Sequence, residues 1–191
     1  MPKCPFGDRP PGRPRPTDGF FFGIFPNLLD RLRTGREAWR HHDWLGLTAW
    51  PLPDHRLHAT LCPLGGGHGR PPGLVECATY VADQVHGAPF EMVFDRIGSF
   101  RRTEGAGPVV ALPGAGKDTF LALQQALRDR FSALGVKLRP YTPHVTLLYD
   151  HQRIEHQAIE PFRWTVREFV LVHSLIGRTR HIILGRWPLT G

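Results

Sequence analysis

The sequence predicts an α+β fold with largely antiparallel sheets, arranged as two similar lobes. Helix-like and strand-like segments are mixed in both halves of the 191-residue chain, which is long enough for two small lobes that share one core. Several strands are joined by links too short for a helical crossover, which favours antiparallel pairing. Each half also contains one copy of His-x-Thr-Leu within a strand-like run, at 58–61 and at 144–147. This repeat indicates two lobes of similar construction.

The first half contains signals for two strands and two helices. The aromatic run FFFGIF has the composition and length of a strand, and Pro26 is well placed at the start of the helix that follows it. Gly87 closes the second helix, and the Gly-rich stretch 64–73 is by composition a connector. The first helix is expected to place Leu28, Leu29, Leu32 and Trp39 on one apolar face. In order, the expected elements are a strand at 20–25, a helix at 26–42, a strand at 55–61 and a helix at 71–87.

The second half contains the helix with the strongest periodicity, which ends at Gly135. Its apolar residues recur at helical spacing, and they are Phe120, Leu123, Leu127, Phe131 and Leu134. The Gly-rich link RRTEGAG and the short basic turn RTR each join two strand-like runs, which predicts two hairpins. In order, the expected elements are strands at 90–100 and 108–113, a helix at 117–135, and strands at 144–149, 164–177 and 181–189.

Residues 1–18 contain six prolines and four basic residues, and they predict a flexible Pro/Arg-rich lead-in before a single domain at 19–191. The lead-in lacks the apolar core of a secretory signal, and the chain has no apolar run long enough to span a membrane. The three cysteines are odd in number and form no C-x-x-C, which argues against a disulfide framework and a structural zinc site. These features predict a cytoplasmic protein.

The chain is basic, with a formal net charge of +7. Four basic and two acidic residues within 1–18 contribute +2, so +5 belongs to the expected domain. A basic surface favours anionic partners such as nucleic acid, although a high pI alone is also compatible with an ordinary basic proteome.

The two His-x-Thr motifs each present one imidazole and one hydroxyl on the same face of a strand. Side chains alternate along a strand, so His58 and Thr60 point to one face while Ala59 and Leu61 point to the other. One copy alone is most simply a solvated or core histidine, but two copies in strand contexts are improbable by chance. Two histidines across a cleft can act as general base and general acid, and two hydroxyls can donate to phosphate oxygens. The pattern therefore predicts phosphoryl chemistry.

HATL at 58–61 and HVTL at 144–147, the latter within RPYTPHVTLLYD, resemble the paired signature of the two-histidine (2H) phosphoesterases. Within that superfamily the chain is most similar to the RNA 2′,3′-cyclic phosphodiesterases, also named 2′-5′ RNA ligases. The resemblance covers nearly the whole chain from about residue 19. It implies a bilobal fold with pseudo-twofold symmetry, in which antiparallel sheets face a central cleft and the helices lie outside.

The activity implied by this resemblance is metal-independent hydrolysis of a terminal 2′,3′-cyclic phosphate of RNA to a 2′-phosphate. One of His58 and His144 would activate water for in-line attack, and the other would protonate the departing 3′ oxygen. Thr60 and Thr146 would hold the phosphate oxygens. The resemblance implies no metal and no cofactor. The expected partner is RNA with cyclic phosphate ends or a related nucleotide, and the expected state is a monomer.

The chain departs from the family pattern at one position. Many family members have an arginine five residues after the second motif histidine, where this chain has Tyr149. Tyr149 is therefore a candidate for stacking or hydrogen bonding to the substrate, with a packed strand-end tyrosine as the alternative. Arg139, just ahead of PYTPH, is the candidate for the replacement phosphate contact.

Three other functions remain open. The same site run backward would join a cyclic phosphate end to a 5′-hydroxyl, which is 2′-5′ RNA ligase activity. A phosphodiesterase acting on a small cyclic nucleotide is the second, and the basic charge weakly favours a polymer over it. The third is a non-catalytic RNA-binding protein, against which the intact His and Thr of both motifs argue. Outside the motifs, His173 and His181 are expected to serve only cross-strand packing.

Overall fold

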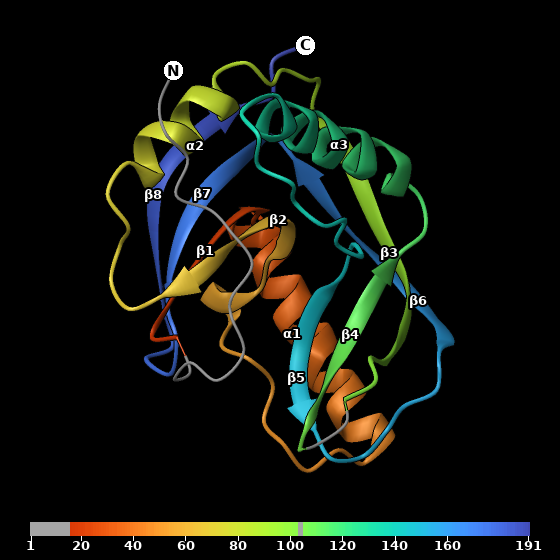
Figure 1. Ribbon diagram of the computed structural model, residues 1–191. Coiled ribbons are helices and arrows are strands. Elements are labelled where there is room, and N and C mark those ends of the chain that lie inside the picture. The colour runs from red at the N-terminus through yellow and green to blue at the C-terminus, as the bar shows by residue number, and fades with distance from the viewer. Residues whose placement is uncertain (1–15, 103–104) are drawn as a thin grey trace.

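The computed structural model describes residues 16–102 and 105–191, and this part of the chain forms an eight-stranded antiparallel sheet with three α-helices (Figure 1). The predicted α+β class is confirmed. In chain order the elements are β1 (Asp18–Ile24), α1 (Leu28–Leu45), the 3₁₀ helix η1 (Asp54–Arg56), β2 (Ala59–Gly67), α2 (Leu74–Ala82), β3 (Phe90–Ser99), β4 (Gly107–Pro113), α3 (Lys117–Ala133), β5 (Val145–Asp150), β6 (Gln157–Val166), β7 (Glu168–Leu175) and β8 (Arg180–Pro188).

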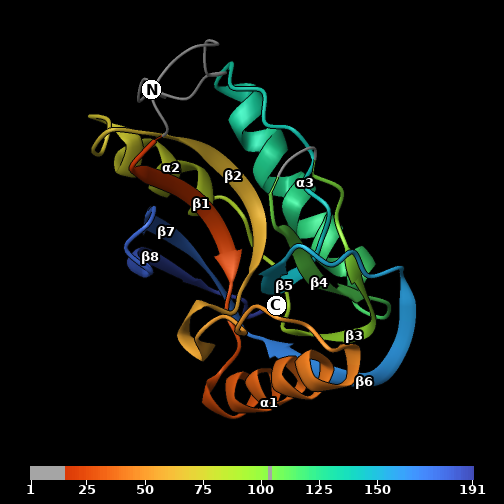
Figure 2. The same ribbon diagram turned by 90° about the horizontal axis from the view of Figure 1, so that it is seen from below.

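The sheet consists of two four-stranded halves that meet at its centre. Its strand order is β6-β3-β4-β5-β2-β1-β7-β8, so β5 and β2 are the two central strands, and each carries one motif. These two strands pair at a single position, Ala59 opposite Val145. Figure 2 shows the halves diverging on either side, with α1 on the opposite side of the molecule from α2 and α3. The two expected lobes are therefore joined edge to edge, and their motif strands lie side by side.

The expected elements of the first half are present, but several of their boundaries were wrong. The helix expected at 71–87 covers only Leu74–Ala82 and ends at Asp83, so Gly87 does not close it. The strand expected at 55–61 begins only at Ala59, because Asp54–Arg56 form η1. It then continues through Gly67, into the stretch expected to be a connector. Gly66 makes this possible, since a Cβ there would come within 2.7 Å of the Asp18 carbonyl oxygen on β1.

The run 164–177 was expected to form one strand, but it contains parts of two strands. β6 ends at Val166 and pairs with β3, whereas β7 begins at Glu168 and pairs with β1. The chain thus crosses from one half of the sheet to the other at Arg167. Pro161 obscured β6 in the sequence, but β6 is an edge strand with a register shift, where proline is tolerated.

Helix α1 is rotated relative to the expectation. Leu28, Leu29 and Leu32 are at least half exposed, so the predicted apolar face is wrong. The buried face is instead largely polar, and hydrogen bonds satisfy it. Trp164 Nε1 donates to Thr34 Oγ1 over 2.7 Å, and the hydroxyl in turn donates to the Asp30 carbonyl. These contacts to β6 determine the rotation of the helix, because burying Thr34 without partners would be costly.

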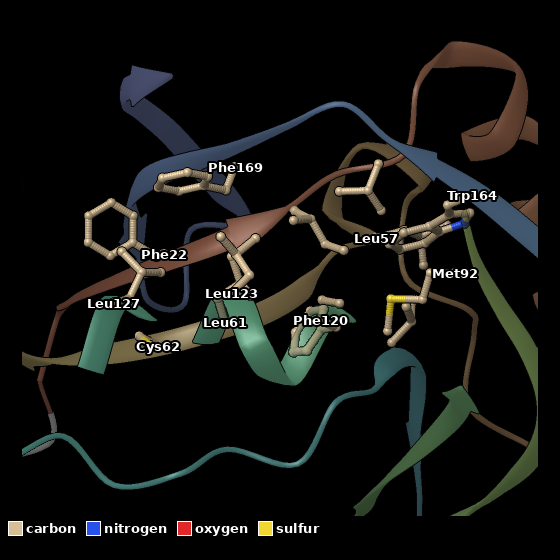
Figure 3. Close-up of a cluster of buried hydrophobic side chains, with 14 of the residues drawn as sticks. Phe22, Leu57, Leu61, Cys62, Met92, Phe120, Leu123, Leu127, Trp164 and Phe169 are labelled. Carbon is tan, nitrogen blue, oxygen red and sulfur yellow. The ribbon is translucent and has the colours of Figure 1, made fainter. Parts of the chain in front are cut away.

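The hydrophobic core extends continuously through both halves of the sheet. Helix α3 contributes Phe120, Leu123, Leu127 and Phe131, as its periodicity predicted, and all four are buried. Figure 3 shows side chains of α3 between Phe22 and Phe169 of one half and Met92 and Trp164 of the other. Because both halves contribute to this core, it fixes the positions of the two motif strands relative to each other.

The structure tests part of the expectations for the N-terminus and the cysteines. Residues 1–15 of the expected lead-in lie outside the described residues, and Asp18, its last residue, already belongs to β1. Cys62 is free and buried. Cys77 is disulfide-bonded, so the expectation of no disulfide is wrong at this residue. None of the described helices is long and apolar enough to cross a membrane.

Asp150, at the end of β5, anchors the loop between α1 and η1. Its Oδ2 accepts hydrogen bonds from the backbone N–H groups of Thr48 and Ala49, and its Oδ1 accepts one from Gln152 N, each over 2.8 Å. Burial alone would raise the pKa of Asp150, but these hydrogen bonds lower it to about 2.

We expect Asp150→Ala to lower the free energy of unfolding by about 3 kcal/mol, because it leaves several backbone donors without their charged acceptor. Urea denaturation followed by circular dichroism measures this change. Asp129→Ala is the matched control, since Asp129 is exposed on α3. Equal stability of the two variants would contradict the anchoring role.

Candidate active site

The four motif residues lie together on one face at the centre of the sheet. Ala59 and Val145 face each other, and both are fully buried on the core side. Extending this antiparallel register by one residue in each direction places His58 opposite Thr146 and Thr60 opposite His144. Residues directly opposite lie on the same face, with Cβ atoms about 5 Å apart, and the Cα atoms of the diagonal histidine pair are separated by about 7–8 Å. The predicted alternation is confirmed, and the register places both His-x-Thr motifs at one site.

Both imidazoles are held in the same way. His58 Nδ1 lies 2.6 Å from the Arg56 carbonyl oxygen, and His144 Nδ1 lies 2.7 Å from the Thr142 carbonyl oxygen. A carbonyl oxygen can only accept, so Nδ1 carries the proton in the neutral form of each ring. Nε2 is therefore the nitrogen that exchanges protons in both motifs. The matching contact, two residues before each histidine, reflects the pseudo-twofold relation of the halves.

The His58 ring is enclosed by aromatic side chains. It stacks on Phe21 and Phe25, with ring centroids 4.9 and 5.4 Å away, and meets His181 edge-on at 5.0 Å. Burial lowers the pKa of His58 to about 4, and the charges of Arg56 and His144 act in the same direction. His58 is therefore neutral at pH 7 in the free protein.

His144 lies in a separate aromatic environment. Its ring centroid is 4.8 Å from that of Phe100 and 5.3 Å from that of Tyr141. Burial lowers the pKa of His144, partly opposed by its hydrogen bond to Thr142. No cation among the described residues contributes to this shift, in contrast to His58 beside Arg56. The two histidines thus have matching orientations but different electrostatic surroundings.

The hydroxyls of Thr60 and Thr146 are available to a ligand. Both side chains are half-buried, and within the described part of the chain neither hydroxyl has a hydrogen-bond partner. A hydroxyl can donate its proton to an anionic oxygen placed between the strands.

Tyr149 shares the face of Thr146 because of a β-bulge. The pairing of β5 with β4 shifts between Thr146 and Leu148, so that Leu147 and Leu148 are both buried. In a regular strand Tyr149 and Thr146 would lie on opposite faces. With the bulge, Tyr149 is 46% exposed, and it interacts electrostatically with Arg56 and Tyr141. It therefore lies at the edge of the site.

Arg139 is exposed and is not among the groups that shift the pKa of His58 or His144. The structure thus gives no support to Arg139 as the replacement phosphate contact, and it remains a prediction from the sequence.

Two residues of the site were missed in the sequence. His181 was expected to serve only cross-strand packing, yet its ring contacts that of His58, and burial with the charges of His58 and Arg56 lowers its pKa to about 3. Arg56 precedes His58 by two residues, and its charge acts on the imidazoles of His58 and His181. The two-residue spacing places Arg56 and His58 close together, but nothing in the sequence signals that β8 lies across from them.

Gln124 of α3 connects the two motif segments from the core side. Its Nε2 donates to the carbonyl of Leu61, directly after the first motif threonine, over 2.9 Å. It also donates to the carbonyl of Tyr141, just before the second motif, over 2.8 Å. Gln124 is only 2% exposed, and its bond to Leu61 is buried, so water cannot replace that bond.

We expect Gln124→Met to lower the free energy of unfolding by about 2–3 kcal/mol, because a buried carbonyl group of Leu61 and a half-buried one of Tyr141 lose their donor. Thermal denaturation of this variant beside Gln125→Met, at an exposed neighbouring position, measures the difference. A Gln124→Met protein as stable as Gln125→Met would show that the connection is dispensable.

A cavity of about 540 Å³ opens beside His58 and His181. Phe25 and His181, which both contact the His58 ring, form part of its wall. Arg31, Arg167 and Arg186 give it a basic lining, and Glu168, which pairs with Arg186, is its acidic residue. The cavity thus adjoins the aromatic surroundings of His58, and its size and charge suit an anionic group.

The chain was compared with known proteins. A family model described as "2′-5′ RNA ligase superfamily" matches residues 28–177. Among solved structures, TT0787 of Thermus thermophilus is 24% identical with a TM-score of 0.71, over 91% of this chain and 98% of that one. E. coli LigT in its apo form is 25% identical with a TM-score of 0.70, over 93% and 100%. The LigT structure complexed with 3′-AMP is 24% identical with a TM-score of 0.69, over the same shares. No curated protein matches the chain.

Proposed function

The chain belongs to the 2′-5′ RNA ligase superfamily of 2H phosphoesterases, and we propose that it hydrolyses the terminal 2′,3′-cyclic phosphate of RNA to a 2′-phosphate. The observation that carries this proposal is the pairing of β2 with β5, whose register brings two Nδ1-protonated imidazoles and two hydroxyls to one face. In this proposal the substrate phosphate lies between the diagonal histidines, where each Nε2 can exchange a proton with one of its oxygens or with the attacking water.

We assign His58 as the general base and His144 as the general acid. The Arg56 charge and the aromatic enclosure keep His58 neutral, as a base must be, whereas no cation of the described chain opposes protonation of His144. His58 Nε2 takes a proton from water as the water oxygen forms a bond to phosphorus. The bond from phosphorus to the 3′ oxygen breaks on the opposite side, and His144 Nε2 supplies the proton that this oxygen needs. The hydroxyls of Thr60 and Thr146 stabilise the charge on the non-bridging oxygens.

Turnover of a short RNA that ends in a 2′,3′-cyclic phosphate tests the proposal. We expect a 2′-phosphate product, separated from the 3′-phosphate isomer by chromatography, at a rate unchanged by EDTA. The reaction needs no Lewis acid, because the imidazole protonates the leaving oxygen. A 3′-phosphate product would mean that the substrate binds with the bond from phosphorus to the 2′ oxygen in line with the attacking water. The absence of turnover on any cyclic phosphate would refute the proposed function.

The alternatives give different products with the same protein. A ligase joins the cyclic end to an RNA with a 5′-hydroxyl, so adding that RNA would yield a longer product with a 2′-5′ linkage. A non-catalytic RNA-binding protein would retain the RNA without changing its end. Either result would replace hydrolysis as the function of the site.

The basic cavity beside His181 favours RNA over a small cyclic nucleotide, because it offers room and positive charge for the nucleotide that precedes the cyclic end. We expect kcat/KM for a cyclic-phosphate oligonucleotide to exceed that for a cyclic mononucleotide at least about tenfold at low salt, and the advantage to shrink as salt increases. Equal values for both substrates would favour the small-molecule alternative.

A further inference from the structure

Arg56 is a cation within the site that has no partner in the described part of the chain. Its Nε is buried and makes no hydrogen bond, and no carboxylate among the described residues forms an ion pair with its guanidinium. Burial lowers the pKa of this side chain, and the charge of Tyr149 opposes this effect only in part. A guanidinium nitrogen that is buried without a hydrogen-bond partner costs free energy. This cost is explained if an anion from outside the chain completes the pairing.

The surroundings of Arg56 place its charge between the two halves of the sheet. It acts on His58 and on His181 of β8 in one half, and Tyr149 of β5 acts on it from the other. Its backbone carbonyl also holds His58 Nδ1. The charge of the guanidinium therefore acts on the His58 imidazole, and Tyr149 of the second motif strand lies close enough to act on that charge.

We propose that Arg56 binds a non-bridging oxygen of the substrate phosphate, and that it supplies the cation that many family members place at the position of Tyr149. This inference rests on the proposed function and extends it to a residue outside both motifs. A planar guanidinium can donate two parallel hydrogen bonds to a phosphate. Binding of the phosphate would pair the orphan Nε and stabilise the negative charge that develops during attack. Because Tyr149 carries no positive charge, Arg56 would supply the positive charge at this edge of the site.

The test is sharp because the Arg56 side chain makes no hydrogen bond or ion pair with the described residues, and such a side chain contributes little to the stability of the folded state. We expect Arg56→Ala to retain the melting temperature of the wild type within a few degrees and to lose about 10²- to 10³-fold in kcat/KM on the cyclic-phosphate RNA. Arg56→Lys should recover part of this loss, since lysine restores the charge but not the planar fork. Arg130→Ala, at an exposed arginine in the last turn of α3, is the control and should remain within about twofold of the wild type.

A rescue variant separates phosphate binding from a structural role. In the Arg56→Ala background, Tyr149→Arg places a cation at the family position. We expect kcat/KM of this double variant to exceed that of Arg56→Ala at least about tenfold. Inorganic phosphate should raise the melting temperature of the wild type and the rescued protein, but not that of Arg56→Ala.

The outcomes for Arg56 and for the proposed function are distinguishable. If the wild type turns over cyclic phosphates and Arg56→Ala is equally active, the inference about Arg56 is wrong while the function stands. If Arg56→Ala unfolds and Tyr149→Arg rescues neither activity nor phosphate binding, Arg56 is a structural residue. If the wild type neither turns over cyclic phosphates nor is stabilised by inorganic phosphate, both proposals fail.

Discussion

His58→Ala and His144→Ala are each expected to lower kcat/KM on a cyclic-phosphate RNA by about 10³-fold, because in the proposed mechanism each removes one of the two proton-transferring groups. Hydrolysis needs the base and the acid in the same turnover. The double variant should therefore be little slower than the slower single variant, since the remaining histidine cannot act alone.

The two variants also differ in a way that tests the assignment of roles. Without His144 the leaving oxygen must depart unprotonated, so a substrate with a more acidic leaving group should recover much of the activity of His144→Ala. The same substrate should not rescue His58→Ala, because water still lacks its base. His86→Ala, at an exposed histidine after α2, is the control and should behave as the wild type. Full activity in either motif variant would show that the reaction takes place elsewhere.

The second large effect is expected in the pH dependence of kcat/KM. Burial lowers the pKa of both His58, to about 4, and His144 below the usual 6.5. In the free protein the productive state has one imidazole protonated and one neutral, and its population falls once the pH exceeds both pKa values. We therefore expect kcat/KM to be greatest below pH 6.5 and to fall about tenfold per pH unit above it, or about 100-fold between pH 6.5 and 8.5.

Initial rates at substrate concentrations well below KM, across pH 4 to 9, measure this profile. A circular dichroism spectrum at each pH distinguishes loss of activity from unfolding at the acid end. His181 should not contribute to the descending limb, because its pKa is lowered to about 3 and it is neutral throughout this range. A profile that is flat up to pH 8 would mean that the catalytic acid keeps its proton in the free protein, contrary to the effect of burial on His144.

The elements that the sequence predicted well are those whose pattern reflects a single packing partner. Helix α3 presents one apolar face to the core, so its periodicity located it closely, and Phe120 and Leu127 are buried as expected. The apolar face predicted for helix α1 was wrong because the inner face of this helix packs through polar groups. Asp30 and Thr34 are buried there and satisfied by hydrogen bonds, whereas Leu28 is exposed. Hydrophobic periodicity cannot detect a face that is stabilised by hydrogen bonds.

The break at Arg167 was hidden for a similar reason. β6 and β7 both have strand-like composition, and only their different partners, β3 and β1, separate them. Pairing partners lie far apart in the chain, so local composition carries little information about them.

The sequence by itself determined the α+β class, the two motif strands and the residues to which we assign the chemistry, because strand alternation alone places His58 with Thr60 and His144 with Thr146. Only the tertiary structure decided how these groups meet. It paired Ala59 with Val145, introduced the bulge that turns Tyr149 towards the site, and placed near His58 the His181 ring and Arg56, which has no ion-pair partner among the described residues. The physical reason is that alternation is a local property of the backbone, whereas register, bulges and unpaired buried charge arise from contacts between segments distant in the chain.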